Sequence, residues 1–309
     1  TDEKTVNDNI GNGGFDIYYG LKSNLTLNLT YNTDFAQVEA DNAQINLTRF
    51  NLFYPEKREF FLTRSKLFAF GNSRQTEVFF SRKIGLNQDV VGGARMLGQI
   101  GKTSVGALNI HTRDDGDLPA THYSAIRLRK DVRDRTTVGA IITDVSSKGV
   151  RNSVYGIDGE MRFWGNSSVS AWYSQVDDTS LVGPSAASMI KLDLRNDRYF
   201  LTTGQHRVDE DFRPGLGFVQ RQDMIGTGII AGFTPRVGDG DELIRQWRFT
   251  IYARDVRNHA GIHETGVLNG GIEAILETRD KIGLKVIQNK EKLTAGFTLG
   301  NGVEIQKGN

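Results

Sequence analysis

The chain has 309 residues, which is enough for two ordinary domains or for one large all-β barrel. Its 38 Lys and Arg residues nearly balance its 37 Asp and Glu residues, so no net positive field attracts nucleic acid. Cysteine is absent, which excludes disulfides and cysteine-ligated metals, and no run approaches the ~18 apolar residues of a membrane helix.

Alternation of apolar and polar residues begins near the N-terminus, at 15–21 and again at 23–32, SNLTLNLTYN. Successive side chains of a strand point to opposite faces, so one face of each strand is apolar and the other polar. A soluble sandwich and a membrane barrel both fit this pattern. We favour the barrel, and we expect the odd positions to face lipid and the even positions to face a wet lumen. The odd positions are Leu25, Leu27, Leu29 and Tyr31, and the even ones are Asn24, Thr26, Asn28 and Thr30.

Residues 35–73 lack this alternation and are unusually rich in phenylalanine. In a soluble protein such a stretch would be a helix and loop that cover a sheet. Inside a wide barrel it would fold inward as a plug, with its aromatic rings packed together. We predict the inward, plug-like arrangement for 35–73.

Further strands are expected along the rest of the chain, about 15–16 in total, many close to the ~9–11 residues that cross a bilayer at a tilt. The clearest alternation is at 155–163, 190–194 and 247–253. Less regular candidates lie at 76–84, 91–101, 103–112, 122–131, 135–145, 167–176, 197–204, 224–234, 264–278 and 281–288.

The connections between these strands alternate in length from residue 101 onward. Tight turns on one rim and long loops on the other are typical of an outer-membrane barrel, whereas a sandwich has no reason for strict alternation. The short connections are 101–103, 132–135, 164–167, 195–197 and 278–281, with 235–242 of middling length; the long ones are 113–120, 146–152, 177–188, 205–223 and 255–266.

No catalytic or metal-binding motif stands out. His259 and His263 are four residues apart but share an expected loop with Gly261, which favours a solvated loop over a metal site. The acidic clusters at 113–117 and 238–242 lack the spacing of a calcium hand. Phosphate loops, nucleotide fingerprints and G-x-S-x-G elbows are absent from the sequence. We therefore predict neither an enzyme nor a bound cofactor or metal.

Several blocks resemble one protein family: YNTDFAQVEADNAQINLTRFNLFYPEKREFFL (31–62), FFSRKIG (79–85), GGARMLG (92–98), DFRPGLGFVQR (211–221) and FTLGNGVEI (297–305). The family comprises bacterial outer-membrane proteins in which a carbohydrate-binding family 9-like domain precedes a barrel of unknown function. The resemblance implies a location in the outer membrane of a Gram-negative bacterium and implies no established activity. It also implies more strands than are present here. We therefore expect this chain to be a fragment whose barrel is completed by residues outside it.

These observations predict an all-β fold: a transmembrane antiparallel up-and-down β-barrel that forms a single domain over residues 1–309. We expect a pore or transport channel for small solutes or saccharides; a structural or assembly barrel that anchors a partner or domain in an envelope complex is the alternative. The expected partners are outer-membrane lipid, other envelope proteins and saccharide. Charged side chains expected in the lumen or plug are Asp34, Glu39, Asp41, Arg49, Glu56, Lys57, Arg58, Glu59, Arg95, Arg127, Arg129, Glu160 and Arg162.

Overall fold

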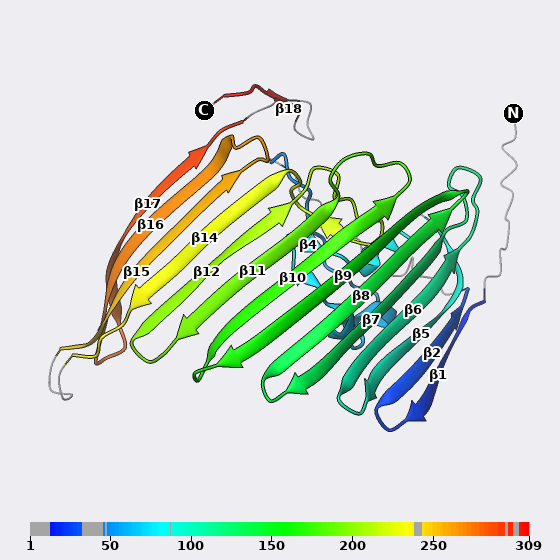
Figure 1. Cartoon of the computed structure of the whole chain (residues 1–309), viewed down its shortest axis with the longest axis horizontal. Helices are drawn as coiled ribbons and strands as arrows, with labels where there is room; N and C mark the ends of the chain where they lie inside the picture. Colours follow the sequence, from blue (N-terminus) through cyan, green and yellow to red (C-terminus); the bar gives the residue numbers. More distant parts are fainter. Residues whose placement is uncertain are drawn as a thin grey trace, which may run out of the picture.

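Fourteen strands form one antiparallel sheet that runs up and down in chain order in the computed structural model (Figure 1). The structure describes residues 13–32, 46, 48–86, 88–237, 243–293, 296–298 and 303–308. The strands of this sheet are β1 (Phe15–Lys22), β2 (Leu25–Tyr31), β5 (Val90–Ile100), β6 (Thr103–Thr112), β7 (His122–Arg133), β8 (Thr136–Ser147), β9 (Val150–Phe163), β10 (Ser167–Asp178), β11 (Ala186–Arg195), β12 (Tyr199–Val208), β14 (Met224–Phe233), β15 (Ile244–Arg257), β16 (His263–Leu276) and β17 (Lys281–Glu291).

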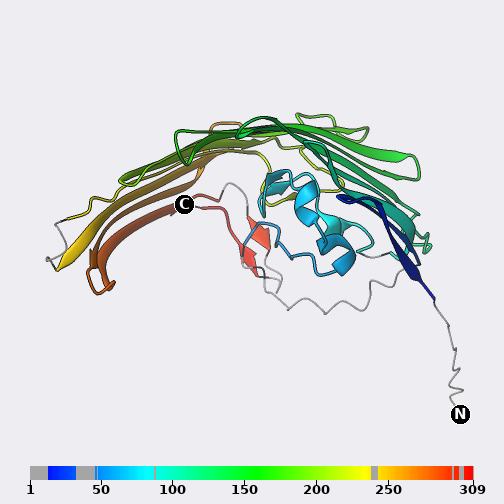
Figure 2. The same ribbon diagram turned by 90° about the horizontal axis from the view of Figure 1, so that it is seen from below.

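The all-β, up-and-down architecture is therefore confirmed, with two corrections. The sheet holds 14 strands instead of the expected 15–16, and it is curved but not closed, with β1 and β17 at its edges (Figure 2). The strand predicted at 76–84 is absent from the sheet. Only Thr76–Glu77 is extended there, and Phe79 leaves the alternating pattern to stack on Phe68 with ring centroids 4.5 Å apart.

The convex face of the sheet is apolar and exposed. Over the middle of β7 to β9 the side chains of one parity are mostly exposed and apolar, while the other parity carries glycine, charged or buried residues. The same holds toward both edges. Exposed apolar residues on this face include Leu29, Ile126, Leu128, Val138, Ile142, Ile157, Met161, Ile190, Ile251, Leu268 and Leu284.

Stacked aromatic rings flank this apolar band on both rims. Phe15 and Tyr31 stack with ring centroids 5.6 Å apart at the rim of the long loops. On the opposite rim Tyr199 stacks on Phe233 at 4.8 Å, and Phe233 stacks on Phe249 at 6.2 Å.

The predicted difference between the rims is largely present. Short turns such as 101–102 and 164–166 lie on one rim, and 113–121 and 209–223 lie on the other. The prediction of a long loop at 146–152 is wrong, because Lys148 and Gly149 alone join β8 to β9. Both residues have positive φ, 40° and 81°, as the tightest hairpin turns require.

Residues 48–86, named here the inner segment, lie on the concave side of the sheet (Figure 2). The inner segment contains α1 (Glu59–Leu62), the 3₁₀ turns η1 (Ser65–Phe68) and η2 (Ser81–Lys83), and the short strands β3 (Gly71–Asn72) and β4 (Thr76–Glu77). Strand β13 (Phe218–Val219), from the loop 209–223, pairs with β4 and completes a three-stranded sheet inside the curve. Two further short strands, β18 (Phe297–Thr298) and β19 (Glu304–Ile305), pair with each other.

The inner segment changes the environment expected for residues 23–32. Leu29 and Tyr31 are exposed as predicted, by 38 % and 52 %. Asn28 and Thr30 face inward but are buried instead of hydrated, because the concave side is filled there. Leu25 is also buried, contrary to the prediction; it begins β2, next to a register shift between Gly20 and Lys22 of β1.

The described part of the chain contains no helix of the length and apolarity needed to cross a membrane.

Candidate functional site

Two apolar clusters attach the inner segment to the sheet. The 14-stranded sheet is called the wall below. Phe60, Phe61 and Phe68 pack with residues of β5 and β6 in the wall, whereas Phe70 packs with residues of β8 to β10. Glycines in the wall leave space for these rings. A Cβ at Gly106 would lie 3.1 Å from the Phe68 ring, and one at Gly156 would lie 2.6 Å from the Phe70 ring. The prediction of an inward segment thus corresponds to residues 48–86, and 35–45 lies outside the described residues.

A buried ion pair fixes the path of the inner segment. Arg58 donates to both carboxylate oxygens of Glu56, at 2.9 and 2.8 Å, and to the carbonyls of Ser81 and Ile84 at 2.7 and 2.6 Å. The Ser81 hydroxyl also donates to Glu56 at 2.6 Å. Burial raises the pKa of Glu56, but the hydrogen bonds from Arg58 and Ser81 outweigh burial and hold this pKa below its usual value. The pair holds residues 56–58 to the turn at 81–84.

Two arginines of the wall are also buried beneath the inner segment, each only 2 % exposed. The Arg95 guanidinium lies 4.3 Å from the centroid of the Phe60 ring and, with the Asn28 amide oriented to satisfy both groups, donates to its oxygen at 2.8 Å. Arg127 forms two hydrogen bonds to Asp158, of 2.6 and 2.7 Å, and lies over the Phe70 ring. Both arginines contribute to packing and do not line open space.

The other predicted residues fall into separate groups. Arg129, Glu160 and Arg162 form a ladder on the inner face, with nitrogen–oxygen distances of 3.6 Å for Arg129–Glu160 and 2.7 Å for Arg162–Glu160. Lys57 is half-buried, and Glu59 is exposed at the start of α1. Asp34, Glu39 and Asp41 lie outside the described residues. The structure therefore does not gather the predicted charges at one site.

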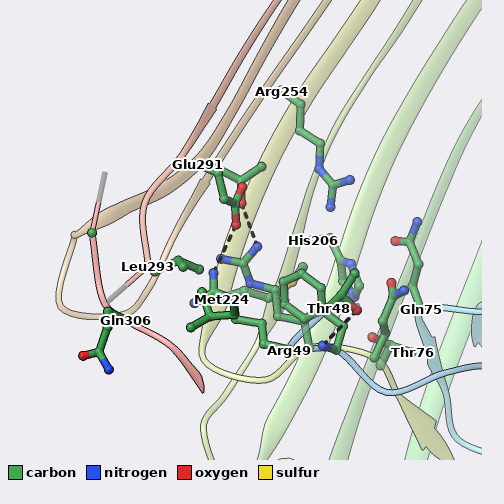
Figure 3. Close-up of a pocket in the computed structure, with 16 residues that line it drawn as sticks. Thr48, Arg49, Gln75, Thr76, His206, Met224, Arg254, Glu291, Leu293 and Gln306 are labelled. Atoms are coloured by element: carbon green, nitrogen blue, oxygen red, sulfur yellow. Dashed lines mark hydrogen bonds and ion pairs between the residues drawn. The ribbon is translucent and has the colours of Figure 1, made fainter. Parts of the chain in front are cut away.

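Arg49 is the exception, since it lines a cavity of about 730 Å³ between the inner segment, the wall and the segment 303–308 (Figure 3). Its guanidinium contacts Glu264 at 3.1 Å and Glu291 at 3.3 Å. Arg221 also pairs with Glu264. The two guanidiniums lie 5.2 and 5.3 Å from the centroid of the Phe50 ring. Burial lowers the pKa of Arg221, whereas Glu264 raises it, so this cluster is largely removed from water.

A smaller cavity of about 230 Å³ adjoins the larger one and shares Gln75, His206 and Arg254 with it. Figure 3 shows the Arg254 side chain reaching from the wall toward His206. His206 and Arg254 are not among the side chains that were predicted for the lumen or plug. The alternation of β15 was a usable signal for Arg254, because Phe249, Ile251 and Ala253 define the outer face and Arg254 has the opposite parity. His206 had no comparable signal.

His259 and His263, on the long-loop rim, contact carboxylate groups. His259 bridges Asp209 and Asp223 at 3.1 and 2.7 Å, and His263 lies 3.1 Å from Asp255. Within the described ranges no group of three or more His, Asp or Glu side chains is placed to hold a metal ion.

Comparison with known proteins gives one match. Residues 1–97 match the model of a domain of unknown function, DUF5916. This stretch includes β1, β2, the inner segment and most of β5. No curated protein and no solved structure matches the chain.

Proposed function

We propose that this chain forms the wall of an outer-membrane β-barrel that acts as a pore or transport channel for small solutes or saccharides, with the inner segment narrowing the lumen. The observation that carries the proposal is the exposed apolar convex face, flanked by aromatic rings on both rims, opposite a charged concave face. A lipid-facing wall needs this arrangement, and strands of 10–14 residues such as β6 to β10 are long enough to cross a bilayer.

A membrane location requires the edges of the sheet to be paired. Backbone groups left open at β1 and β17 would be unsatisfied in lipid. In this proposal further strands or a partner complete the wall, and the polar concave face then encloses water.

Conductance in planar bilayers tests the channel. We expect the full-length protein to conduct, and we expect replacement of residues 48–86 by a short flexible linker to raise the single-channel conductance. Arg162→Gln is the control. It changes an exposed residue of the Arg129–Glu160–Arg162 ladder and leaves the apolar contacts of the inner segment intact, so it should keep the wild-type conductance. Absence of conductance in all three proteins, with insertion verified by protease protection, contradicts the channel.

The packing of the inner segment favours a second candidate, a structural barrel that anchors an envelope complex. Two apolar clusters and the Arg58–Glu56 pair fix the inner segment on the wall, which suits a permanently filled interior. A stoichiometric partner that survives gel filtration from solubilised outer membrane supports this candidate. A lone, monodisperse barrel that conducts contradicts it.

A further inference from the structure

Two glycines separate two cationic side chains in one row across the inner face of the wall. Lys191 of β11 pairs in register with Gly204 of β12, Gly204 with Gly228 of β14, and Gly228 with Arg254 of β15. The row spans three strand spacings, or roughly 14 Å. Because residues opposite each other in a sheet project to the same face, Lys191 and Arg254 flank a stretch of wall that has no side chains.

This row forms the floor of the smaller cavity. His206, two residues along β12 from Gly204 on the same face, is 8 % exposed and has no hydrogen-bond partner at Nε2. Asp and Glu are absent from the described residues that line the smaller cavity. Neither Lys191 nor Arg254 forms an ion pair within the described parts of the chain, in contrast to Arg49 and Arg221 next to them. The smaller cavity, called the hollow below, is therefore lined by two cationic side chains and by no carboxylate among the described residues.

We propose that this hollow binds an oxyanion, the carboxylate or phosphate group of a small solute, and that the rest of the solute occupies the adjoining cavity of about 730 Å³. Arg254 and Lys191 provide the charge, and Nε2–H of His206 provides a further donor. A guanidinium matches the geometry of a carboxylate or a phosphate. The larger cavity has a volume in the usual range for small-molecule sites. This binding site would give the proposed channel a substrate class. It rests on the proposed function only for the route by which the solute reaches the wall.

The test is calorimetric titration of the full-length protein in detergent at neutral pH, with glucuronate, glucose and inorganic phosphate as probes. We expect glucuronate to bind about tenfold or more tightly than glucose, because only glucuronate carries a carboxylate. Arg254→Gln should weaken glucuronate binding by about tenfold or more. Gly228→Val should also weaken it, by filling the hollow; a Cβ there lies no closer than 3.8 Å to any atom, so the variant is expected to fold.

Arg248→Gln is the matched control. Arg248 lies on the same strand and the same face as Arg254 but is paired with Glu273 at 3.0 Å, and its replacement should leave glucuronate binding unchanged. Equal binding of glucuronate and glucose, or glucuronate binding that survives Arg254→Gln, overturns the proposal. Binding of phosphate without glucuronate supports the oxyanion hollow and overturns the assignment of the larger cavity to the solute. A protein that binds glucuronate but does not conduct refutes the channel and leaves the binding site intact.

Discussion

Gly139 is predicted to be a position on the wall where a single methyl group is poorly tolerated. It lies on β8, between the strands that carry Arg127 and Asp158, and is directly opposite Asp158 in register. A Cβ at Gly139 would lie in the path of the Arg127–Asp158 pair, closer than van der Waals contact to both the guanidinium and the carboxylate. The two charged groups would have to separate to make room.

The cost of Gly139→Ala follows from the burial of this pair. Arg127 is almost fully buried over the Phe70 ring, so its guanidinium cannot regain water when it loses Asp158. The Asp158 side chain keeps 24 % exposure and can be partly rehydrated. We therefore expect a loss of about 3 kcal/mol in the free energy of unfolding, the low end of the range for breaking a buried pair.

Urea unfolding of the full-length protein, followed by tryptophan fluorescence, measures this loss. Trp172 is a suitable reporter because its ring lies 5.9 Å from the Phe70 ring. Gly159→Ala is the control on the neighbouring strand, where the nearest atom to an added Cβ is 3.6 Å away, and it should change stability by less than about 0.5 kcal/mol.

A double-mutant cycle then separates the ion pair from backbone strain. In an Arg127→Leu background, Gly139→Ala should cost less than about 1 kcal/mol, since the pair is already absent. An unchanged cost in that background would show that the penalty comes from the backbone. Wild-type stability of Gly139→Ala alone would refute the reasoning altogether.

Three further predictions concern the inner segment and the outer face. Gly156→Val should displace the Phe70 ring and increase protease cleavage within residues 48–86, because a Cβ there would be 2.6 Å from the ring; an unchanged cleavage pattern would refute this. Burial raises the pKa of Glu77 above its ordinary value of 4.5. Wild-type protein should therefore lose stability as the pH rises from 4.5 through the raised pKa, because the buried carboxyl group ionises over that interval. Glu77→Gln does not ionise and should become progressively more stable relative to wild type over the same interval; parallel pH profiles would contradict this. Ile157→Arg on the outer face should destabilise the protein in lipid vesicles by about 2–4 kcal/mol, whereas Ser170→Arg, opposite Glu160 on the inner face, should cost much less. Equal costs for these two variants would argue against a lipid-facing convex side.

The alternation of residue types predicted most strands of the sheet. The range 103–112 coincides with β6, and 281–288 lies within β17. Alternation works here because each strand buries or exposes whole faces, so the side-chain period of two appears directly in the sequence. The exception at 76–84 arises because Phe79 and its neighbours pack in the inner segment, where no sheet imposes that period.

Alternation assigns a residue to a face but does not reveal what covers that face. Asn28 and Arg95 have the polar parity expected of a wet lumen, yet both are buried by side chains of the inner segment. The covering residues are far away in sequence; Arg95, for example, meets Phe60 from a separate stretch of chain. The glycine row at 204 and 228 was equally hidden, because only the strand register shows that Lys191 and Arg254 lie at its two ends.

Glycines of the concave face are covered in one part of the wall and open in another. At Gly106 and Gly156 the missing side chain is replaced by a phenylalanine of the inner segment, which converts the gap into a packing contact. At Gly228 no atom lies within ordinary contact distance of an added Cβ except one backbone oxygen at 3.8 Å, so the gap stays open. The inner segment thus closes the wall along β5 to β10 and leaves the cationic row of β11 to β15 accessible. In the proposed channel, a solute that passes the inner segment would meet this row, so the proposed narrowing of the lumen and the proposed preference for an anion would have the same structural origin.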